Sequence, residues 1–452
     1  MDGTDTVFPV RRAIDQIRET AGPGAAPEEA AQPVSPYRIA ASLIVSPENE
    51  EQTAGVLRLA SANRYTVVPQ GGGTKDALGG AAGKADILLS MRKMSGILQH
   101  SVGDLMVTAL PGTTVGELQD KLREEGQFLP LDPAWSRQST IGGMTAANAS
   151  GPKRALYGSV RDHLIASRAV LADGTIIRTG AKVVKNVAGY DMNKLFVGSM
   201  GTLGVLTELT FKIRPLPASA GLAAFRSGGL GEWKRLQESL LDSQLEPCAA
   251  ELISAAEAQE LFGSPEPMVL VLFEDVEASV RYQLDRLKSA AEDAGLKPFA
   301  EICGCGETEP VIEGLRALAP NALDAPPDRL IVSMKLLSRL TDVPDICEFA
   351  VKSGEEAGLQ VRFGGGLYTG ISHATVAADW QRLQETIRWI RSVFVYMEEL
   401  NGGATLSFAP PEVRSAVPAW GTDRSGNELM RSVKQQFDSA HILNRGRFVG
   451  GI

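Results

Sequence analysis

Short apolar runs broken by glycine-rich loops mark the first part of the chain. A helix is expected to begin at Ser46-Pro47-Glu48, which combines a hydroxyl N-cap, a proline at the first helical position and an acid in the first turn. Runs of aliphatic residues predict strands over 65–69 and 86–90. Residues 39–90 are therefore expected to form a β-α-β unit with a glycine-rich loop after its second strand.

The same α+β pattern continues to residue 217. Asp173-Gly174 is a strong local signal for a tight turn between two strands. Pro215-Leu216-Pro217 then interrupts the pattern and marks a domain boundary. The expected elements are a strand over 105–110, a helix over 114–125 between the N-cap Thr114 and the stop signal Gly126, a hairpin over 164–178, and a strand over 204–214.

Longer amphipathic helices alternate with strands in the second half of the chain. Residues 218–408 are therefore expected to form a separate α+β cap domain built on an antiparallel sheet. The strand candidates cover 220–225, 268–273, 329–335 and 359–363, and the helix candidates cover 275–294, 342–357 and 377–399.

The two ends of the chain differ from these domains. Residues 1–35 hold a short helix candidate over 10–19 followed by a run rich in glycine, alanine and proline, which predicts a poorly ordered lead-in. Ala409-Pro410-Pro411 marks a further junction, and residues 409–452 are expected to contain a last helix over 424–438.

Composition narrows the classes of function. The 452 residues carry a net charge of −9, whereas a general nucleic-acid binder needs a basic face. We find no apolar run long enough to cross a bilayer and no apolar region typical of a secretory signal, so a cytoplasmic location is expected. The four cysteines make neither a disulfide framework nor the run that holds an iron–sulfur cluster, and no metal site is expected.

Candidate chemistry begins in the loop within residues 67–75. Three consecutive glycines, 71–73, follow a strand and precede Thr74 and Lys75. Because glycine has no Cβ, such a run lets backbone N–H groups converge on an anion at close range. The spacing matches neither the P-loop nor the dinucleotide fingerprint, and a plain tight loop is the alternative. Lys75 is interpreted as solvated.

Several motifs in a fixed order resemble the FAD-binding domain of the vanillyl-alcohol oxidase (PCMH-type) superfamily. They are Pro69-Gln70-Gly71-Gly72-Gly73-Thr74, Thr140-Ile141-Gly142-Gly143, Tyr157-Gly158-Ser159-Val160-Arg161-Asp162 and Gly201-Thr202-Leu203-Gly204-Val205-Leu206-Thr207, with Ile442-Leu443-Asn444-Arg445-Gly446-Arg447 at the end of the chain. Arg445 stands where that family usually has proline.

This resemblance implies an α+β fold of three parts. Two α+β subdomains over residues 36–217 would bind FAD, residues 218–408 would form the cap, and the C-terminal helix and tail would return to the FAD domain. Asp162 has the alternative role of capping a turn. The residues that the resemblance places at the cofactor are Pro69, Gly71, Gly72, Gly73, Thr74, Pro111, Gly112, Thr140, Gly142, Gly143, Asn148, Gly158, Asp162, Gly204, Val205 and Asn444.

A narrower resemblance points to the FAD-binding subunits of bacterial glycolate oxidases. It rests on residues 149–154, 184–191 and 446–452. It implies a hetero-oligomer with a second flavin subunit and an iron–sulfur subunit, a small 2-hydroxy acid as substrate, and peripheral membrane association through those partners. Within the second segment, Lys185-Asn186 and Tyr190-Asp191 either hold an anionic substrate or brace the domain against a partner.

Two departures from the superfamily affect the expected chemistry. The histidine-rich motif and the Glu-His-Gly-Ile-Gly segment of its 2-hydroxy-acid dehydrogenases are absent, and residues 402–406 stand where the first would lie. Residues 74 and 75 replace the histidine that carries a covalent flavin, so non-covalent FAD is expected.

Arg447 is a candidate to stabilise negative charge on the reduced ring. Hydride transfer from an alcohol needs a base, but the four histidines, at 100, 163, 373 and 441, do not nominate one, and no catalytic residue is assigned.

The sequence therefore predicts an FAD-dependent oxidoreductase that serves as the FAD-binding subunit of a glycolate or D-lactate dehydrogenase complex. In that complex, its FAD would relay electrons from a sister subunit or anchor the fold. A self-sufficient dehydrogenase of another hydroxy acid or alcohol is the alternative from the same chemistry. A non-catalytic assembly subunit is the alternative from another class.

Overall fold

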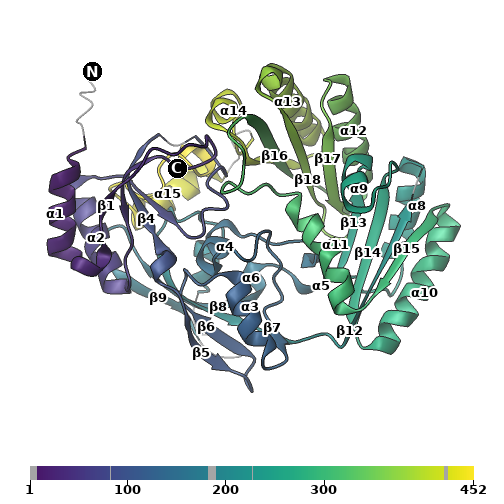
Figure 1. Ribbon diagram of the computed structural model, residues 1–452, viewed down its shortest axis with the longest axis horizontal. Coiled ribbons are helices and arrows are strands. Elements are labelled where there is room, and N and C mark those ends of the chain that lie inside the picture. Colours follow the sequence, from purple (N-terminus) through teal and green to yellow (C-terminus); the bar gives the residue numbers. More distant parts are fainter. Residues whose placement is uncertain (1–7, 82, 182–189, 227, 422–425) are drawn as a thin grey trace.

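Two larger sheets and a two-stranded ribbon in the N-terminal half, and one large sheet in the cap domain, organise the described chain (Figure 1). The computed structural model describes residues 8–81, 83–181, 190–226, 228–421 and 426–452. The first sheet has the order β1-β2-β4-β3, in which β2, β4 and β3 are parallel. Its strands are β1 (Glu28–Glu29), β2 (Ala41–Val45), β4 (Ala85–Ser90) and β3 (Val67–Gln70).

Helix α2 (Glu50–Asn63) connects β2 to β3, as the β-α-β pattern predicts. The expected start of this helix at Ser46 is wrong by about one turn. Asn49 is the N-cap, because its side chain in an extended backbone accepts a hydrogen bond from the Gln52 N–H at 2.9 Å.

Residues 8–35 of the predicted lead-in contain a helix, a 3₁₀ turn and a short strand, which differs from the poor order predicted for this part. Helix α1 (Val10–Ala21) confirms the short helix candidate and packs along α2. Its buried residues Ala13 and Ile17 belong to the same apolar core as the first sheet. A short 3₁₀ turn (Pro23–Ala25) and β1 then lead into the sheet.

The second sheet is antiparallel throughout, with the order β5-β6-β10-β8-β9. The hairpin predicted around Asp173-Gly174 is confirmed, and Gly174 takes a positive φ of 82° in its turn. Thr114 caps α3 through a reciprocal capping box with Glu117. The strands are β5 (Ile97–Ser101), β6 (Met106–Ala109), β8 (Leu164–Val170), β9 (Ile176–Gly180) and β10 (Val205–Lys212), and the helices are α3 (Val115–Arg123), α4 (Ile141–Ala147), α5 (Arg154–Tyr157), α6 (Val160–His163) and α7 (Asn193–Phe196).

The cap domain begins directly after the Pro215–Pro217 boundary and is built on one eight-stranded antiparallel sheet, as expected. The sheet order is β15-β12-β14-β13-β17-β18-β16-β19. Four of its strands were not predicted, and residues 377–379 belong to a strand rather than to the helix expected over 377–399. The strands are β12 (Ser219–Arg226), β13 (Ala249–Ile253), β14 (Met268–Asp275), β15 (Lys297–Cys303), β16 (Arg329–Leu337), β17 (Val361–Gly366), β18 (Ile371–Asp379) and β19 (Gly403–Phe408).

The two faces of this sheet have different neighbours. The largest apolar core packs α8, α10, α12 and α13 against the face that points away from the N-terminal domain. The other face, which we call the inner face, meets α9, α11 and residues of α5. The cap helices are α8 (Leu230–Leu241), α9 (Ala255–Phe262), α10 (Glu277–Ala294), α11 (Cys305–Ala317), α12 (Val343–Glu356) and α13 (Leu383–Glu399).

The end of the chain returns to the first sheet. Helices α14 (Pro411–Ala416) and α15 (Asn427–Phe437) lead into a tail whose Leu443 forms a parallel bridge with Val67 of β3. The Val67 N–H donates to the Ile442 carbonyl at 2.8 Å, and the Asn444 N–H donates to the Val67 carbonyl at 2.8 Å. Figure 1 shows the yellow C-terminal segment against the purple and blue N-terminal domain. Among the described helices, none has the length and hydropathy needed to traverse a bilayer.

Candidate functional site

The glycine loop after β3 lies in a groove where three distant segments meet. We call this groove the cradle. It consists of two adjoining hollows that share Pro69, Gly71 and Met200. Of the residues predicted from the sequence, the cradle is lined by Pro69, Gly71, Gly72, Gly73, Thr74, Pro111, Thr140, Gly142, Gly143, Gly204, Val205 and Asn444.

Backbone N–H groups of the glycine loop are free to bind a ligand. The N–H groups of residues 72–75 have no hydrogen-bond acceptor within the described part of the chain. The loop is held in place at Asp76, which is 4% exposed and accepts hydrogen bonds from Gln70 at 2.8 Å and Arg38 at 2.9 Å. Buried backbone N–H groups are nearly always paired, so this row is suited to oxygens of a phosphate or diphosphate.

Close approach between segments explains why glycine occupies the loop. A Cβ on Gly72 would lie 1.9 Å from the Gln138 carbonyl oxygen, and a Cβ on Gly71 would lie 2.1 Å from Thr140 Oγ1. Across the cradle, a Cβ on Gly142 would lie 2.7 Å from the Pro111 ring. The walls of the cradle are therefore backbone, and the group that it holds meets peptide rather than side chains.

The C-terminal tail supplies one wall of the cradle through Asn444 and Arg447. Asn444 is 2% exposed, has a φ of 47° and donates a side-chain hydrogen bond to the Met200 carbonyl. Arg447 is 4% exposed and donates to the Asp76 and Leu78 carbonyls, both at 2.8 Å. Its Nε is buried without a partner among the described residues, and burial lowers the pKa of its guanidinium. Arg447 thus braces the loop and leaves one donor for an anionic ligand.

Other predicted residues lie elsewhere. Gly112 faces backbone instead of the cradle, because a Cβ there would lie 2.2 Å from the Met91 carbonyl oxygen of a 3₁₀ turn (Met91–Lys93). Gly158 and Asp162 do not line the cradle, and Asp162 takes the alternative role of a cap by accepting from the Ser159 N–H at 2.8 Å. Asn148 lines the neighbouring chamber described below, where its Oδ1 is buried without a partner among the described residues.

The described part of the segment predicted to hold a substrate, residues 190 and 191, does not line the cradle. Lys185 and Asn186 lie outside the described residues. Tyr190 is 93% exposed, and Asp191 pairs with Lys194 at 3.4 Å, so neither lines the cradle. Lys75, interpreted as solvated, instead lines both the cradle and the chamber, and burial lowers its pKa.

A chamber of about 140 Å³ adjoins the cradle and is closed by the inner face of the cap sheet. We call it the inner chamber; it shares Thr74, Lys75, Leu78 and Ala147 with the cradle. Lys335 of β16 lies directly opposite His373 of β18, and His373 lies opposite Gly364 of β17. Glu251 of β13 lies opposite Gly366, one pleat along the same face.

Glycines of β17 make room between these polar side chains. A Cβ on Gly366 would lie 2.1 Å from Thr369 Oγ1 and 3.2 Å from Glu251 Oε1, and a Cβ on Gly364 would lie 2.8 Å from Leu318. The absence of side chains on this stretch of β17 therefore leaves a hollow between Glu251 on one side and His373 on the other.

The chamber is lined by more basic than acidic side chains, and two of its lysines lack a carboxylate partner among the described residues. Burial first, and then the charges of Arg154 and Lys75, lower the pKa of Lys335 to about 8. Burial first, and then the charges of Lys335 and Lys75, lower the pKa of His373 to about 3. His373 Nδ1 is buried without a hydrogen-bond partner, and neither Lys335 nor Lys75 pairs with a carboxylate, within the described part of the chain.

The lysines and the histidine of the inner chamber can bind an anion and accept a proton. Two lysines without a carboxylate partner attract an anion, and a neutral imidazole with a free nitrogen accepts a proton from a bound hydroxyl group. Sequence patterns missed these residues because Lys335, His373 and Glu251 stand on three strands that are distant in the chain. The available signal was the glycine run 364–366 directly after the strand candidate 359–363, because glycines next to a strand mark a close approach or a hollow.

Comparison with known proteins identifies the group that the cradle fits. Residues 41–180 match the family described as FAD binding domain. The chain is 26% identical over 432 residues to glycolate oxidase subunit GlcD of Bacillus subtilis (strain 168), which covers 91% of this chain and 89% of that protein. The free N–H groups, the buried Arg447 donor and the backbone walls fit the diphosphate of FAD.

Other relatives match over a part of their length. Glycolate oxidase subunit GlcE of Escherichia coli (strain K12) is 37% identical over 189 residues, which cover 42% of this chain and 52% of that protein. Mitochondrial D-lactate dehydrogenase [cytochrome] of Arabidopsis thaliana is 35% identical over 181 residues, which cover 40% of this chain and 32% of that protein. The chain thus spans about half or less of these two proteins.

Among solved structures, p-cresol methylhydroxylase with substrate bound superimposes with a TM-score of 0.74 at 14% identity. The match covers 97% of this chain and 96% of that protein, and at this identity it shows the fold alone. The mixed α+β architecture is therefore confirmed.

Proposed function

We propose that this chain, an FAD-dependent oxidoreductase, oxidises a small 2-hydroxy acid, glycolate or D-lactate, in the inner chamber. The observation that carries the proposal is that Lys335 and His373 lie opposite each other on neighbouring strands of the cap sheet, beside the cradle. The names of the relatives supply the substrate class.

The residues that would hold the FAD are 71–74, Asn444 and Arg447. No histidine, cysteine or tyrosine side chain that could form a covalent link to the flavin is among the described residues that line the cradle. Non-covalent binding is therefore part of the proposal. When bound, FAD supplies the acceptor for the hydride of the substrate.

The chain's own side chains would bind the substrate and take its proton. Lys335, assisted by Lys75 and Arg154, attracts the substrate carboxylate, because these three cations face the chamber. His373 is neutral at physiological pH and accepts the hydroxyl proton. A carboxylate between the lysines offsets the charges that depress the pKa of His373, so this imidazole becomes a better base when substrate is bound.

We further propose that the chain works inside a glycolate oxidase complex in the cytoplasm. The names of the relatives GlcD and GlcE favour a multi-subunit assembly. A second flavin subunit and an iron–sulfur subunit would take the electrons onward and provide any peripheral attachment to a membrane. Within the described residues, no group of histidine, cysteine or carboxylate side chains has the arrangement of a metal site.

The experiment that tests this function uses the purified chain alone. Its visible spectrum is recorded before and after anaerobic addition of glycolate, D-lactate or L-lactate. Loss of the flavin band with glycolate or D-lactate supports oxidation by this chain. A flavin that stays oxidised with every substrate overturns this proposal in favour of electron relay, and a folded chain without flavin leaves an assembly role. Acid precipitation separates the two modes of attachment, because only non-covalent FAD remains in the supernatant.

A further inference from the structure

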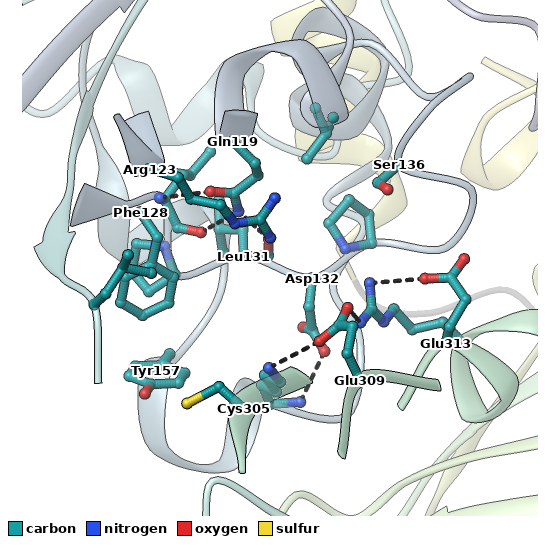
Figure 2. A pocket seen from close by; sticks show the side chains of 18 of the residues that line it. Gln119, Arg123, Phe128, Leu131, Asp132, Ser136, Tyr157, Cys305, Glu309 and Glu313 are labelled. Atoms are coloured by element: carbon teal, nitrogen blue, oxygen red, sulfur yellow. Dashed lines mark hydrogen bonds and ion pairs between the residues drawn. The ribbon is translucent and has the colours of Figure 1, made fainter. Parts of the chain in front are cut away.

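A second and larger hollow lies on the far side of the inner chamber's wall. This outer cavity has a volume of about 610 Å³ and opens between the N-terminal domain and helix α11. Figure 2 shows it lined by Arg123 and Phe128 on one side and by Cys305, Glu309 and Glu313 on the other. Its size, its charged lining and its position at the domain junction make it a water-accessible space.

One thin wall separates the two spaces. Arg316 of α11 lines both of them, whereas Asp132 lines the outer cavity and Gly151 lines the inner chamber. Asp132 accepts the Gly151 N–H at 3.0 Å, and a Cβ on Gly151 would lie 2.6 Å from Asp132 Oδ2. The backbone of Gly151 therefore lies directly against the Asp132 carboxylate, at the edge of the inner chamber.

Glu251 stands on the chamber side of this wall and has no assigned role in binding FAD or substrate. It is 9% exposed, and its carboxyl makes no hydrogen bond or ion pair with any residue that the structure describes. Its Oε1 lies over Gly366, one pleat along the sheet face from the row that holds His373. Water in the chamber can bridge such a separation, since the hollow exceeds the volume of several water molecules.

The charges around these two carboxyls bias them toward carrying a proton. Burial first, and then the nearby Asp132 charge, raise the pKa of Glu251 to about 8. Burial also raises the pKa of Asp132, although Arg316 and Lys153 oppose the shift. The other charged or titratable groups that face the chamber are Lys75, Arg154, Arg316, Lys335 and His373. His373, with its depressed pKa, is a poor place to keep a proton, and Glu251 binds one more tightly.

We propose that Glu251 and Asp132 carry the hydroxyl proton of the substrate from the inner chamber to the outer cavity. The inference rests on the proposed function. Glu251 first passes its own proton to the Asp132 carboxylate, which releases it to water in the outer cavity. His373 takes the proton from the hydroxyl group and passes it through water to the Glu251 carboxylate that is left. Each group gains and loses one proton, and the hydride with its electron pair goes to the flavin, so one proton leaves per substrate oxidised.

The first test follows the proton itself. The flavin-loaded chain is mixed rapidly with substrate under anaerobic conditions in weak buffer with a pH-indicator dye. In the wild-type protein, proton release is expected to keep pace with loss of the flavin band. In Glu251→Gln and Asp132→Asn, proton release is expected to lag at least tenfold behind flavin reduction. Glu313→Gln is the control, because Glu313 lines the outer cavity and pairs with Arg316 at 3.1 Å but does not line the inner chamber.

The outcomes separate the relay from the function on which it rests. If proton release keeps pace with normal flavin reduction in both Glu251→Gln and Asp132→Asn, the relay is overturned and the proposed function is not. A wild-type protein whose flavin is never reduced overturns the proposed function and the relay together.

The second test needs no turnover. Infrared titration of the flavin-loaded chain is expected to show a protonated carboxyl band that disappears with a midpoint near pH 8, is missing in Glu251→Gln and shifts to lower pH in Asp132→Asn. A band that is absent, or that Asp132→Asn leaves in place, overturns the coupling. Melting curves identify any variant that fails to fold. If Asp132→Asn does not fold, the loss of the band in the isosteric Glu251→Gln still tests the assignment of the band to Glu251.

Discussion

Lys434 and Asp438 form a buried ion pair one helical turn apart, with Lys434 Nζ 2.6 Å from Asp438 Oδ2. The same ammonium group donates to the Thr202 carbonyl at 2.8 Å and to the Leu443 carbonyl at 2.9 Å. Asp438 in turn accepts the Leu443 N–H at 2.8 Å. The pair thus joins the end of α15, the loop before β10 and the tail that lines the cradle.

Replacing Lys434 with Met is expected to destabilise the protein and to release FAD. The change leaves the Asp438 carboxylate, which is 1% exposed, without its partner, and losing one member of a buried pair costs about 3–5 kcal/mol of unfolding free energy. Chemical denaturation and flavin content measure the two effects. Lys288→Met is the control, because Lys288 pairs with Glu301 on the surface and such pairs contribute about 0–1 kcal/mol. Equal effects of the two variants would contradict the role given to the Lys434 pair.

A methyl group on Gly72 is expected to abolish FAD retention. In Gly72→Ala the new Cβ would overlap the Gln138 carbonyl oxygen, which forces the loop and its free N–H groups apart. The flavin-to-protein absorbance ratio after gel filtration measures the loss. Gly103→Ala is matched to it, since a Cβ there meets nothing within 4 Å. Full flavin content in Gly72→Ala would refute the assignment of the cradle.

Lys335→Met is expected to raise the melting temperature while it weakens substrate binding. The pKa of Lys335 is about 8 in the folded chain and 10.5 in its ordinary state, so the unfolded chain binds more protons between these values and stability rises with pH across that window. Below about pH 8 the unpaired charge therefore lowers stability, and the Met variant removes that cost. A melting temperature that falls in this variant would argue for a structural ion pair.

The same lysine predicts a pH dependence of substrate affinity. Because the charge of Lys335 is lost as the pH rises through about 8, KM is expected to increase above that pH in the wild-type protein. In Lys335→Met, KM is expected to be high at every pH, with no inflection near 8. Steady-state rates with glycolate from pH 6 to 9.5 measure both profiles, and identical profiles would exclude Lys335 from the carboxylate site.

His373→Gln is expected to lower kcat by about 10²- to 10⁴-fold with normal flavin content, because the variant lacks a base of comparable strength. His100→Gln serves as the control, since His100 hydrogen-bonds to Gln127 at 2.8 Å outside the chamber. Anaerobic reduction rates at saturating glycolate measure the effect. A rate within a factor of three of the wild type would remove His373 from the mechanism.

Local signals in the sequence located the glycine loop and the hairpin turn. The glycines at 71–73 and the Asp173-Gly174 turn each have a conformational need that only a few residue types meet. The prediction failed for Ser46, because Asn49 competes successfully for the cap of α2. It failed for the lead-in because the apolar stripe of α1 is short and becomes buried only when α2 lies beside it.

The inner chamber was beyond local signals. Lys335 and His373 face each other only because β18 pairs with β16, and Glu251 joins them only because β13 pairs with β17. Such register is set by packing between distant strands, which the order of residues in the chain does not reveal. A lone histidine or lysine in a strand reads as a surface residue until its neighbours across the sheet are known.

The bridge between Val67 and Leu443 links the C-terminal tail to the glycine loop. Strand β3 runs directly into the glycine loop, and two main-chain hydrogen bonds join Val67 to Ile442 and Asn444. A displacement of this tail would therefore reach the glycine loop through the backbone of β3, without any side chain to transmit it.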